Sequence, residues 1–214
     1  MNSIKSKEVV KNFNKLWDEQ TKVSTIGKII FKFDRHKIMS LLKYTDLTFD
    51  SNIVDVGCGT GGTLKMFRNH GFYNSIGIDA TESSMKLCQE SGFKRNKDVF
   101  QVDINKDKFN KKFDLAFAEG VIEHYVNIQP VVNNLCKLSK KYVLTTMPNL
   151  SSFSWNIFEI SLKIMGRKHV DDFKHEDYEY INAFRKAGFK LVKLKNLTFG
   201  WVMLFEKTIK KNKR

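Results

Sequence analysis

A cluster of glycines preceded by an aspartate has the composition of a ligand-binding turn. Residues 53–62 read Ile-Val-Asp-Val-Gly-Cys-Gly-Thr-Gly-Gly, so an apolar segment containing Asp55 runs directly into glycines. Glycine lets a ligand approach the backbone closely, because no Cβ is in the way, and a helix that follows points its N–H groups at that ligand. Gly57, Gly59 and Gly62 satisfy the dinucleotide pattern G-x-G-x-x-G, which alone leaves a nicotinamide-linked oxidoreductase open.

Three acids narrow the choice of ligand. Asp55 lies inside the apolar segment, where a carboxylate is costly unless it meets a cation or hydrogen-bond donors; it repels a pyrophosphate and attracts an ammonium group. Asp79 follows about 20 residues after the glycines, where an acid accepts from both ribose hydroxyls of either cofactor. Asp103 ends a further apolar segment and is placed to accept from an adenine amino group.

Two of these acids also have purely structural explanations. Asp79 can cap the helix that follows it, although Thr81 and Ser83 are available for that task. Asp103 can begin a turn with Asn105. The binding role is the one that we carry forward for each.

Alternating strands and helices are predicted to position these residues. Short apolar segments bounded by turn residues predict parallel strands joined by helices, and the last two segments flank Phe199-Gly200 as a hairpin. The predicted strands are 53–56, 75–78, 98–102, 113–117, 142–146, 189–197 and 201–207, and the predicted helices are 5–22, 34–45, 63–68, 83–90, 128–138 and 176–186. The fold class is therefore α/β: a Rossmann-like seven-stranded sheet, mostly parallel with one antiparallel strand, and helices on both faces.

The length of 214 residues suits a single domain, which we divide by pattern. Residues 1–50 form an N-terminal helical cap and residues 51–150 the cofactor-binding core. Residues 151–175 form an insert that we expect to be a lid, and residues 176–214 supply the last helix and the closing hairpin.

These motifs together resemble the class I S-adenosylmethionine-dependent methyltransferases, in particular the small-molecule type often labelled type 11. The resemblance rests on the glycine motif, on Asp79 and on Asp103-Ile104, and it covers roughly residues 50–150. Residues 113–124, which end in Glu123-His124, look like the fourth strand of the family and the turn that follows it.

The resemblance implies S-adenosylmethionine as cofactor and a role for each motif. Gly57, Gly59 and Gly61 would line the methionine portion, Asp55 would face its ammonium group, and Glu119 would close over that end. Asp79, with Ala80 beside it, would hold the ribose. Asp103 and the Ile104 backbone would bind the adenine. The resemblance implies methyl transfer to an oxygen or nitrogen atom of a small-molecule acceptor, which the sequence leaves unidentified.

His124 is the candidate general base, because a neutral imidazole accepts a proton from a hydroxyl or amine near pH 7. The alternative is a histidine that hydrogen-bonds only within its own turn. In quinone-type O-methyltransferases that use a metal the pattern is Glu-x-x-Glu-His, and here Gly120 replaces the first glutamate. We therefore predict no essential metal. A second possible metal group, His169, Asp171, Asp172 and His175, is better explained as a polar loop.

The net charge of +14 leaves a polyanionic partner open. Only six of the 37 basic residues are arginine, whereas bidentate recognition of phosphates and bases favours arginine. We therefore favour a lysine-rich surface over nucleic-acid binding, and keep an RNA-modifying methyltransferase as the alternative. The spacing of the three cysteines, the lack of a secretion signal and the lack of a long apolar run predict a cytoplasmic protein without a transmembrane segment. We expect a monomer or weak homodimer.

The acceptor side is predicted to come from outside the cofactor core. Two segments carry spare aromatic residues that can exclude water and grip an apolar acceptor. These are Phe13, Trp17, Phe31 and Phe33 in one, and Phe153, Trp155, Phe158 and Phe173 in the other. The alternatives are that these residues complete the core, or that the insert touches a membrane.

Overall fold

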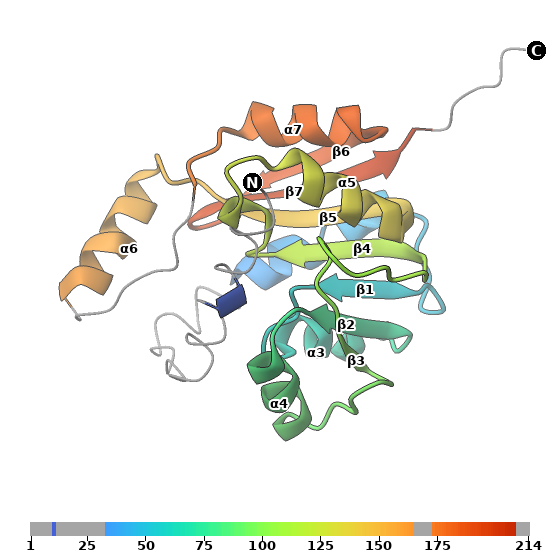
Figure 1. Cartoon of the computed structure of the whole chain (residues 1–214). Helices are drawn as coiled ribbons and strands as arrows, with labels where there is room; N and C mark the ends of the chain where they lie inside the picture. Colours follow the sequence, from blue (N-terminus) through green and yellow to red (C-terminus); the bar gives the residue numbers. More distant parts are fainter. Residues whose placement is uncertain (1–9, 12–32, 165–172, 209–214) are drawn as a thin grey trace, which may run out of the picture.

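The computed structural model describes residues 10–11, 33–164 and 173–208 of the chain. Seven strands form one sheet in the order β3-β2-β1-β4-β5-β7-β6 (Figure 1). The strands are β1 (Ile53–Val56), β2 (Ser75–Asp79), β3 (Val99–Gln101), β4 (Phe113–Glu119), β5 (Ser139–Pro148), β6 (Phe189–Asn196) and β7 (Gly200–Lys207). The predicted fold class is confirmed: β7 runs antiparallel to both of its neighbours, and the pairs formed by β1 to β5 are parallel.

Helices cover both faces of this sheet (Figure 1). They are α3 (Gly62–Asn69), α4 (Glu82–Glu90), α5 (Gln129–Leu138), α6 (Phe153–Ile164) and α7 (Asp177–Lys186), with single 3-10 turns at η1 (Leu42–Tyr44) and η2 (Ile122–His124). A further helix spans residues 33–39. Apart from Val10 and Lys11, the predicted helix 5–22 lies outside the described residues. None of the described helices is long and apolar enough to cross a membrane.

The alternation of side chains along β1 determines which residues reach the cofactor side. Val54 and Val56 point to the face covered by α5 and α7 and join the larger apolar cluster. Ile53 points to the opposite face, where it packs with Phe67 of α3. Because successive residues of a strand point to opposite faces, Asp55 shares the face of Ile53 and of α3.

The predicted helix 34–45 is shorter than expected. The Ser40 hydroxyl donates to the Lys37 carbonyl over 2.6 Å, a local bond that competes with helical pairing. The Leu41 N–H then donates to Ile38, three residues back, so the helix tightens at this point. Ile38 and Leu41 are nevertheless fully buried against the sheet. The N-terminal segment is therefore part of the core where it is described.

The closing hairpin depends on one glycine. Strand β7 pairs with β5 along its whole length, with Gly200 opposite Pro148. A Cβ atom on Gly200 would lie 2.0 Å from the Met147 carbonyl oxygen, a distance that no side chain tolerates. Glycine at this position lets β7 enter the sheet between β5 and β6.

Candidate active site

The glycine loop after β1 has a backbone that only glycine adopts readily. Gly57, Gly59 and Gly61 have φ angles of 72°, 52° and 78°, in the left-handed region. At Gly57 and Gly61 the surrounding space is also closed to side chains. A Cβ on Gly57 would lie 2.5 Å from Val121, and one on Gly61 would lie 2.6 Å from Phe93. Backbone conformation therefore favours glycine at all three positions, and packing requires it at Gly57 and Gly61.

Gly59 is held by hydrogen bonds from three directions. Its N–H donates to Asp79 Oδ2 over 3.0 Å. Its carbonyl oxygen accepts from Ser84 Oγ over 2.5 Å and from Cys88 Sγ over 3.2 Å, both on α4. The loop is thus fastened to the end of β2 and to two turns of α4, and its shape is set before any ligand arrives.

Asp79 organises the turn between β2 and α4. Besides accepting from Gly59, its carboxylate accepts from both the backbone N–H and the hydroxyl of Thr81, over 2.9 and 2.8 Å. The helix itself is capped by Thr81, whose hydroxyl accepts from the Ser84 N–H. Asp79 therefore does not cap α4, as the alternative in the sequence analysis had it. Thr81 makes the cap, and Asp79 links Thr81 to the glycine loop.

Asp55 is a carboxylate inside the sheet. Its side chain is buried, with 1% of the residue exposed, and its Oδ2 atom has no hydrogen-bond partner among the described residues. Burial raises the pKa of Asp55 well above its ordinary value, and the nearby carboxylates of Glu119 and Asp79 raise it further. A cationic ligand next to Asp55 would relieve both effects.

Glu119 completes a group of three acids at the ends of neighbouring strands. Val56 pairs with Ile78 and with Ala118, so the residues that follow, Asp79 and Glu119, flank the first glycine of the loop. Glu119 accepts from the Thr63 hydroxyl in the first turn of α3 over 2.9 Å. Burial raises the pKa of Glu119, while the Thr63 bond and the charge of Arg35 oppose that rise.

Arg35 is a residue that the sequence analysis missed. One of its guanidinium nitrogens lies 2.9 Å from the position that a Cβ on Gly62 would take, at the start of α3. Its helix is fixed by Asp34, which accepts from the N–H and hydroxyl of Thr198 in the β6–β7 turn. Nothing in the local sequence around Arg35 indicates this position, since only the tertiary fold brings the N-terminal segment to the glycine loop.

Asp103 lies in a turn of its own making. Its Oδ1 accepts from the Asn105 N–H over 3.0 Å, and Lys106 forms an ion pair with its Oδ2 over 2.5 Å. This is the turn that the sequence analysis gave as the alternative. Ala80 and Ile104 are half-buried after the ends of β2 and β3. The side-chain amide of Gln101, the last residue of β3, donates to the Ala80 carbonyl. The adenine-binding roles of Asp103 and Ile104 remain predictions.

His124 is buried in the turn after β4. Its Nε2 atom lies 3.1 Å from the Gly120 carbonyl oxygen. Because a carbonyl only accepts, Nε2 carries a proton in this arrangement. Gly120 has a φ of 68°, so a glutamate at this position would have a strained backbone. Among the described residues, no group of three histidine, cysteine or acidic side chains is placed to hold a metal ion.

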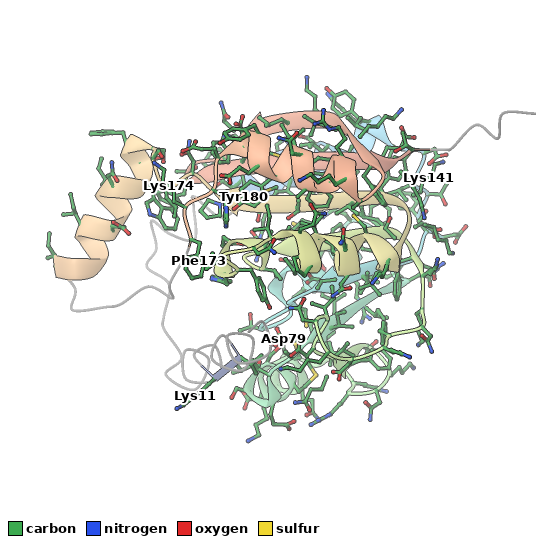
Figure 2. All side chains as sticks on the ribbon, turned by 45° about the horizontal axis from the view of Figure 1, so that its top comes forward. Lys11, Asp79, Lys141, Phe173, Lys174 and Tyr180 are labelled. Carbon is green, nitrogen blue, oxygen red and sulfur yellow. The ribbon has the colours of Figure 1, made fainter. Side chains whose placement is uncertain are left out.

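The segment before α7 packs onto this same turn. The Phe173 N–H donates to the Glu123 carbonyl over 2.9 Å, and His175 Nε2 lies 2.9 Å from the Tyr125 carbonyl oxygen. Figure 2 shows Phe173 and Lys174 at the carboxyl ends of the strands, on the opposite side from Lys141. His169, Asp171 and Asp172 lie outside the described residues.

Residues 54–141 match the family model for a methyltransferase domain. A ubiquinone biosynthesis O-methyltransferase of Rickettsia canadensis is 33% identical over 146 residues, which cover 63% of this chain and 59% of the relative. The chain spans only 55 to 59% of the length of the first four such relatives. One from Pelagibacter ubique is 27% identical over 225 residues, 94% of this chain and 90% of the relative.

A solved structure shares the complete fold. Magnesium protoporphyrin IX methyltransferase of Synechocystis PCC 6803, with bound S-adenosylhomocysteine, superposes with a TM-score of 0.70 at 16% identity, covering 94% of this chain and 99% of that one. Together these matches support a class I S-adenosylmethionine-dependent methyltransferase. The predictions of family and cofactor are confirmed.

The fold of this methyltransferase also sets the nicotinamide alternative aside. Dinucleotide-binding sheets have the strand order 3-2-1-4-5-6. Here an antiparallel strand lies between β5 and β6, giving 3-2-1-4-5-7-6. The glycine pattern that the two classes share is thus placed in the sheet of a methyltransferase.

Proposed function

We propose that this methyltransferase transfers a methyl group to a hydroxyl oxygen of a small aromatic acceptor related to the quinones. The observation that carries the proposal is the similarity to ubiquinone biosynthesis O-methyltransferases, which in the Pelagibacter ubique protein extends over 94% of this chain. The same activity is named for the Rickettsia relatives. The site described above is compatible with this reaction in three respects, which concern the cofactor, the base and the acceptor.

The first respect is the charge of the cofactor pocket. S-adenosylmethionine carries a sulfonium and an ammonium group, and Asp55, Asp79 and Glu119 gather three carboxylates beside the glycine loop. In our proposal Asp55 faces the ammonium group and Asp79 the ribose hydroxyls. Arg35 is placed at the start of α3 to bind the carboxylate of the methionine portion, together with the helix N–H groups.

The second respect is the position of a base. Methyl transfer from a sulfonium is an in-line displacement that needs alignment more than chemical assistance, since the cofactor is already activated. A phenolic hydroxyl still has to lose its proton. We propose that His124, whose Nε2 atom lies 3.1 Å from the Gly120 carbonyl oxygen, accepts this proton.

The third respect is the apolar cover at the acceptor side. Helix α6 begins beside the β6–β7 turn, where Ser154 Oγ donates to the Thr198 carbonyl over 2.6 Å, and Trp155 is buried there. Four apolar residues of α6 follow one another at helical spacing and are largely exposed. They are Phe153, Ile157, Ile160 and Ile164, with exposed fractions of 80, 52, 56 and 81%. We propose that α6 and Phe173 form a lid over the acceptor.

The experiment supplies S-adenosylmethionine with a labelled methyl group and a dihydroxybenzene that carries a short isoprenoid chain. We expect label on one hydroxyl oxygen, and none on the matched compound whose hydroxyls are already methylated. His124→Gln should slow transfer most near neutral pH, where the hydroxyl is protonated and a neutral imidazole can accept its proton, and least at high pH, where the hydroxyl is already ionised. Binding of S-adenosylhomocysteine without any transfer to these acceptors would contradict the proposed acceptor class while leaving the family assignment intact.

An RNA acceptor is the alternative that the charge of the chain keeps open. Transfer of the labelled methyl group to bulk transfer RNA, abolished by ribonuclease, would favour RNA over the aromatic acceptor.

We propose that the reaction takes place in the cytoplasm. The three cysteines, Cys58, Cys88 and Cys136, form no disulfide, which agrees with a reducing compartment.

A further inference from the structure

A second pocket lies on the α5 face of the sheet, under the segment that joins β3 to β4. Its volume is about 470 Å³, within the range of pockets that hold small molecules. The segment 104–112 forms one wall, and the C-terminal half of α5 forms the other. Neither the family assignment nor the proposed function assigns any role to this pocket.

The wall of this pocket is strongly basic. Five of its lining residues are lysines and one is an aspartate. The lysines are Lys106, Lys108, Lys111, Lys112 and Lys137. Lys106 is paired with Asp103, and Lys137 donates to the side chain of Asn134. Lys108 and Lys112 form no ion pair with any described residue. Four of these lysines lie within residues 106–112, and the fold adds Lys137 from α5 to them.

The floor of the pocket is apolar and its sides offer amide groups. Ile78, Val102 and Phe109 line it from the sheet and from the connecting segment. The Phe109 ring is itself supported, because it stacks on Phe113 at 6.3 Å and packs against Phe100 at 5.7 Å. Three asparagines, Asn105, Asn110 and Asn134, complete the lining. Asn105 donates to the Tyr125 hydroxyl and accepts from Asn134, whose own oxygen accepts from Lys137. Because an amide has two N–H hydrogens and two oxygen lone pairs, each of these side chains keeps one of each for a ligand.

This pocket extends away from the cofactor site. Lys112 directly precedes β4 and Leu138 ends α5 directly before β5, so the far end of the pocket lies at the amino ends of those strands. The glycine loop, Asp79 and Glu119 lie at the carboxyl ends. Of the residues predicted to bind the cofactor, only Ile104 also lines this pocket.

We propose that this pocket binds a small phosphorylated ligand with a flat ring, of the nucleoside diphosphate class. The lysines supply the charge for the phosphates, the apolar floor with Phe109 supplies a surface for the ring, and the asparagines supply partners for its polar edge. A concave pocket of this volume matches a single nucleotide and not an extended strand of RNA.

A membrane surface fits this region less well than a small ligand. Peripheral membrane binding combines basic residues with apolar side chains on one face. In this protein the exposed apolar residues of α6 are at the opposite end of the molecule from the β3–β4 segment and the end of α5 (Figure 1). The lysines of the pocket and the apolar face of α6 therefore do not lie on one surface that a membrane could contact together.

The test measures ADP, pyrophosphate and a single-stranded RNA oligonucleotide by isothermal titration calorimetry on the full chain. We expect ADP to bind more tightly than pyrophosphate, because only ADP has a ring that can pack on the apolar floor of the pocket. Saturating S-adenosylhomocysteine should leave the affinity for ADP unchanged. Reversing two charges with Lys108→Glu and Lys112→Glu together should weaken ADP binding about tenfold or more.

The matched control is the double variant Lys65→Glu and Lys86→Glu, which changes net charge equally at two exposed positions of α3 and α4. It should alter ADP binding by less than about twofold. Equal weakening in both double variants would show that only overall charge attracts the anion, and displacement of ADP by S-adenosylhomocysteine would show that the pocket belongs to the cofactor site. RNA binding tighter than ADP binding would also overturn the proposal. Unchanged affinity for S-adenosylhomocysteine verifies that the variants fold.

Discussion

The cofactor side and the acceptor side of this methyltransferase are built by different means. On the cofactor side, the glycine loop and Asp79 are joined by short hydrogen bonds between residues that are close in the chain or on neighbouring strands. On the acceptor side, α6 is attached by its first turn and then presents apolar side chains such as Phe153 and Ile164 to solvent. The cofactor side is therefore preorganised before a ligand binds, whereas the acceptor side has exposed apolar surface that an acceptor could cover.

This difference teaches where specificity resides in such a fold. A polar site has to be preorganised, because each buried carboxylate or N–H group that lacks a partner is costly. An apolar cover is less demanding, since apolar contacts are not directional and tolerate many arrangements. The first kind of region is constrained to particular residues, and the second is constrained mainly to a hydrophobic pattern. Four experiments test this comparison, beginning with the largest expected effect.

Replacing Ser151 to Asp172 with a short glycine–serine linker should abolish turnover and leave cofactor binding almost intact. The physical reason is that the proposed cofactor contacts lie within residues 52–150 and at Arg35, outside the replaced segment, whereas the exposed apolar side chains of α6 lie within it. The affinity for S-adenosylhomocysteine, measured by calorimetry, should change by less than about 0.5 kcal/mol. A parallel loss of cofactor affinity and thermal stability would show instead that the segment belongs to the core.

Replacing Asp79 with alanine should weaken S-adenosylhomocysteine binding by about 1–3 kcal/mol, because the Gly59 N–H loses a charged acceptor, as do the two ribose hydroxyls that we propose it binds. Asp50→Ala, at an exposed position outside the site, is the control and should have no effect. Wild-type affinity in Asp79→Ala would mean that the loop keeps its shape without this carboxylate and that the ribose is held elsewhere.

The third experiment concerns the protonation of Asp55. Its pKa is raised in the folded protein above the ordinary value of 3.8, so the folded state holds a proton that the unfolded state has lost. Stability should therefore fall as pH rises from 3.8 toward the raised pKa, and Asp55→Asn should remove that fall. The cationic cofactor favours the charged carboxylate, so cofactor binding should tighten with pH over the same window.

The direct readout for Asp55 is proton release. Calorimetry in buffers of different ionisation enthalpy should detect protons released on cofactor binding below the raised pKa, and Asp55→Asn should release fewer. Identical release in the two proteins would assign the proton to another group, for which Glu119 is the next candidate, since burial raises its pKa as well.

The smallest expected effect is that of chelation. Activity with an identified acceptor should be unchanged in EDTA, because Gly120 provides no carboxylate and its φ of 68° disfavours any side chain there. Loss of activity on chelation that magnesium or zinc restores would show a metal site that neither sequence nor described residues reveal.

The sequence was a good guide where chemistry is local in the chain. The glycine loop and the acid after β2 are recognisable because their residues lie within short segments, and the alternation of strands and helices predicts the sheet. Arg35 escaped detection, because its position beside Gly62 depends on how the N-terminal helix packs under the sheet. Asp103 illustrates a different limit. Its carboxylate already binds Asn105 and Lys106, and the sequence pattern alone does not tell whether such local partners or a ligand bind a carboxylate.

The position of β7 has a consequence for the order in which the chain is made. The strand pairs with both β5 and β6, so β6 has no partner in the sheet until residues 200–207 are available. During synthesis, β1 to β5 can assemble behind the ribosome, but the edge of β5 stays open until the hairpin arrives. The pairing of β5 with β7 joins residues more than fifty positions apart, and such contacts form slowly. A nascent chain that stops before Gly200 would therefore expose an unpaired strand edge, the kind of surface that chaperones bind and that promotes aggregation.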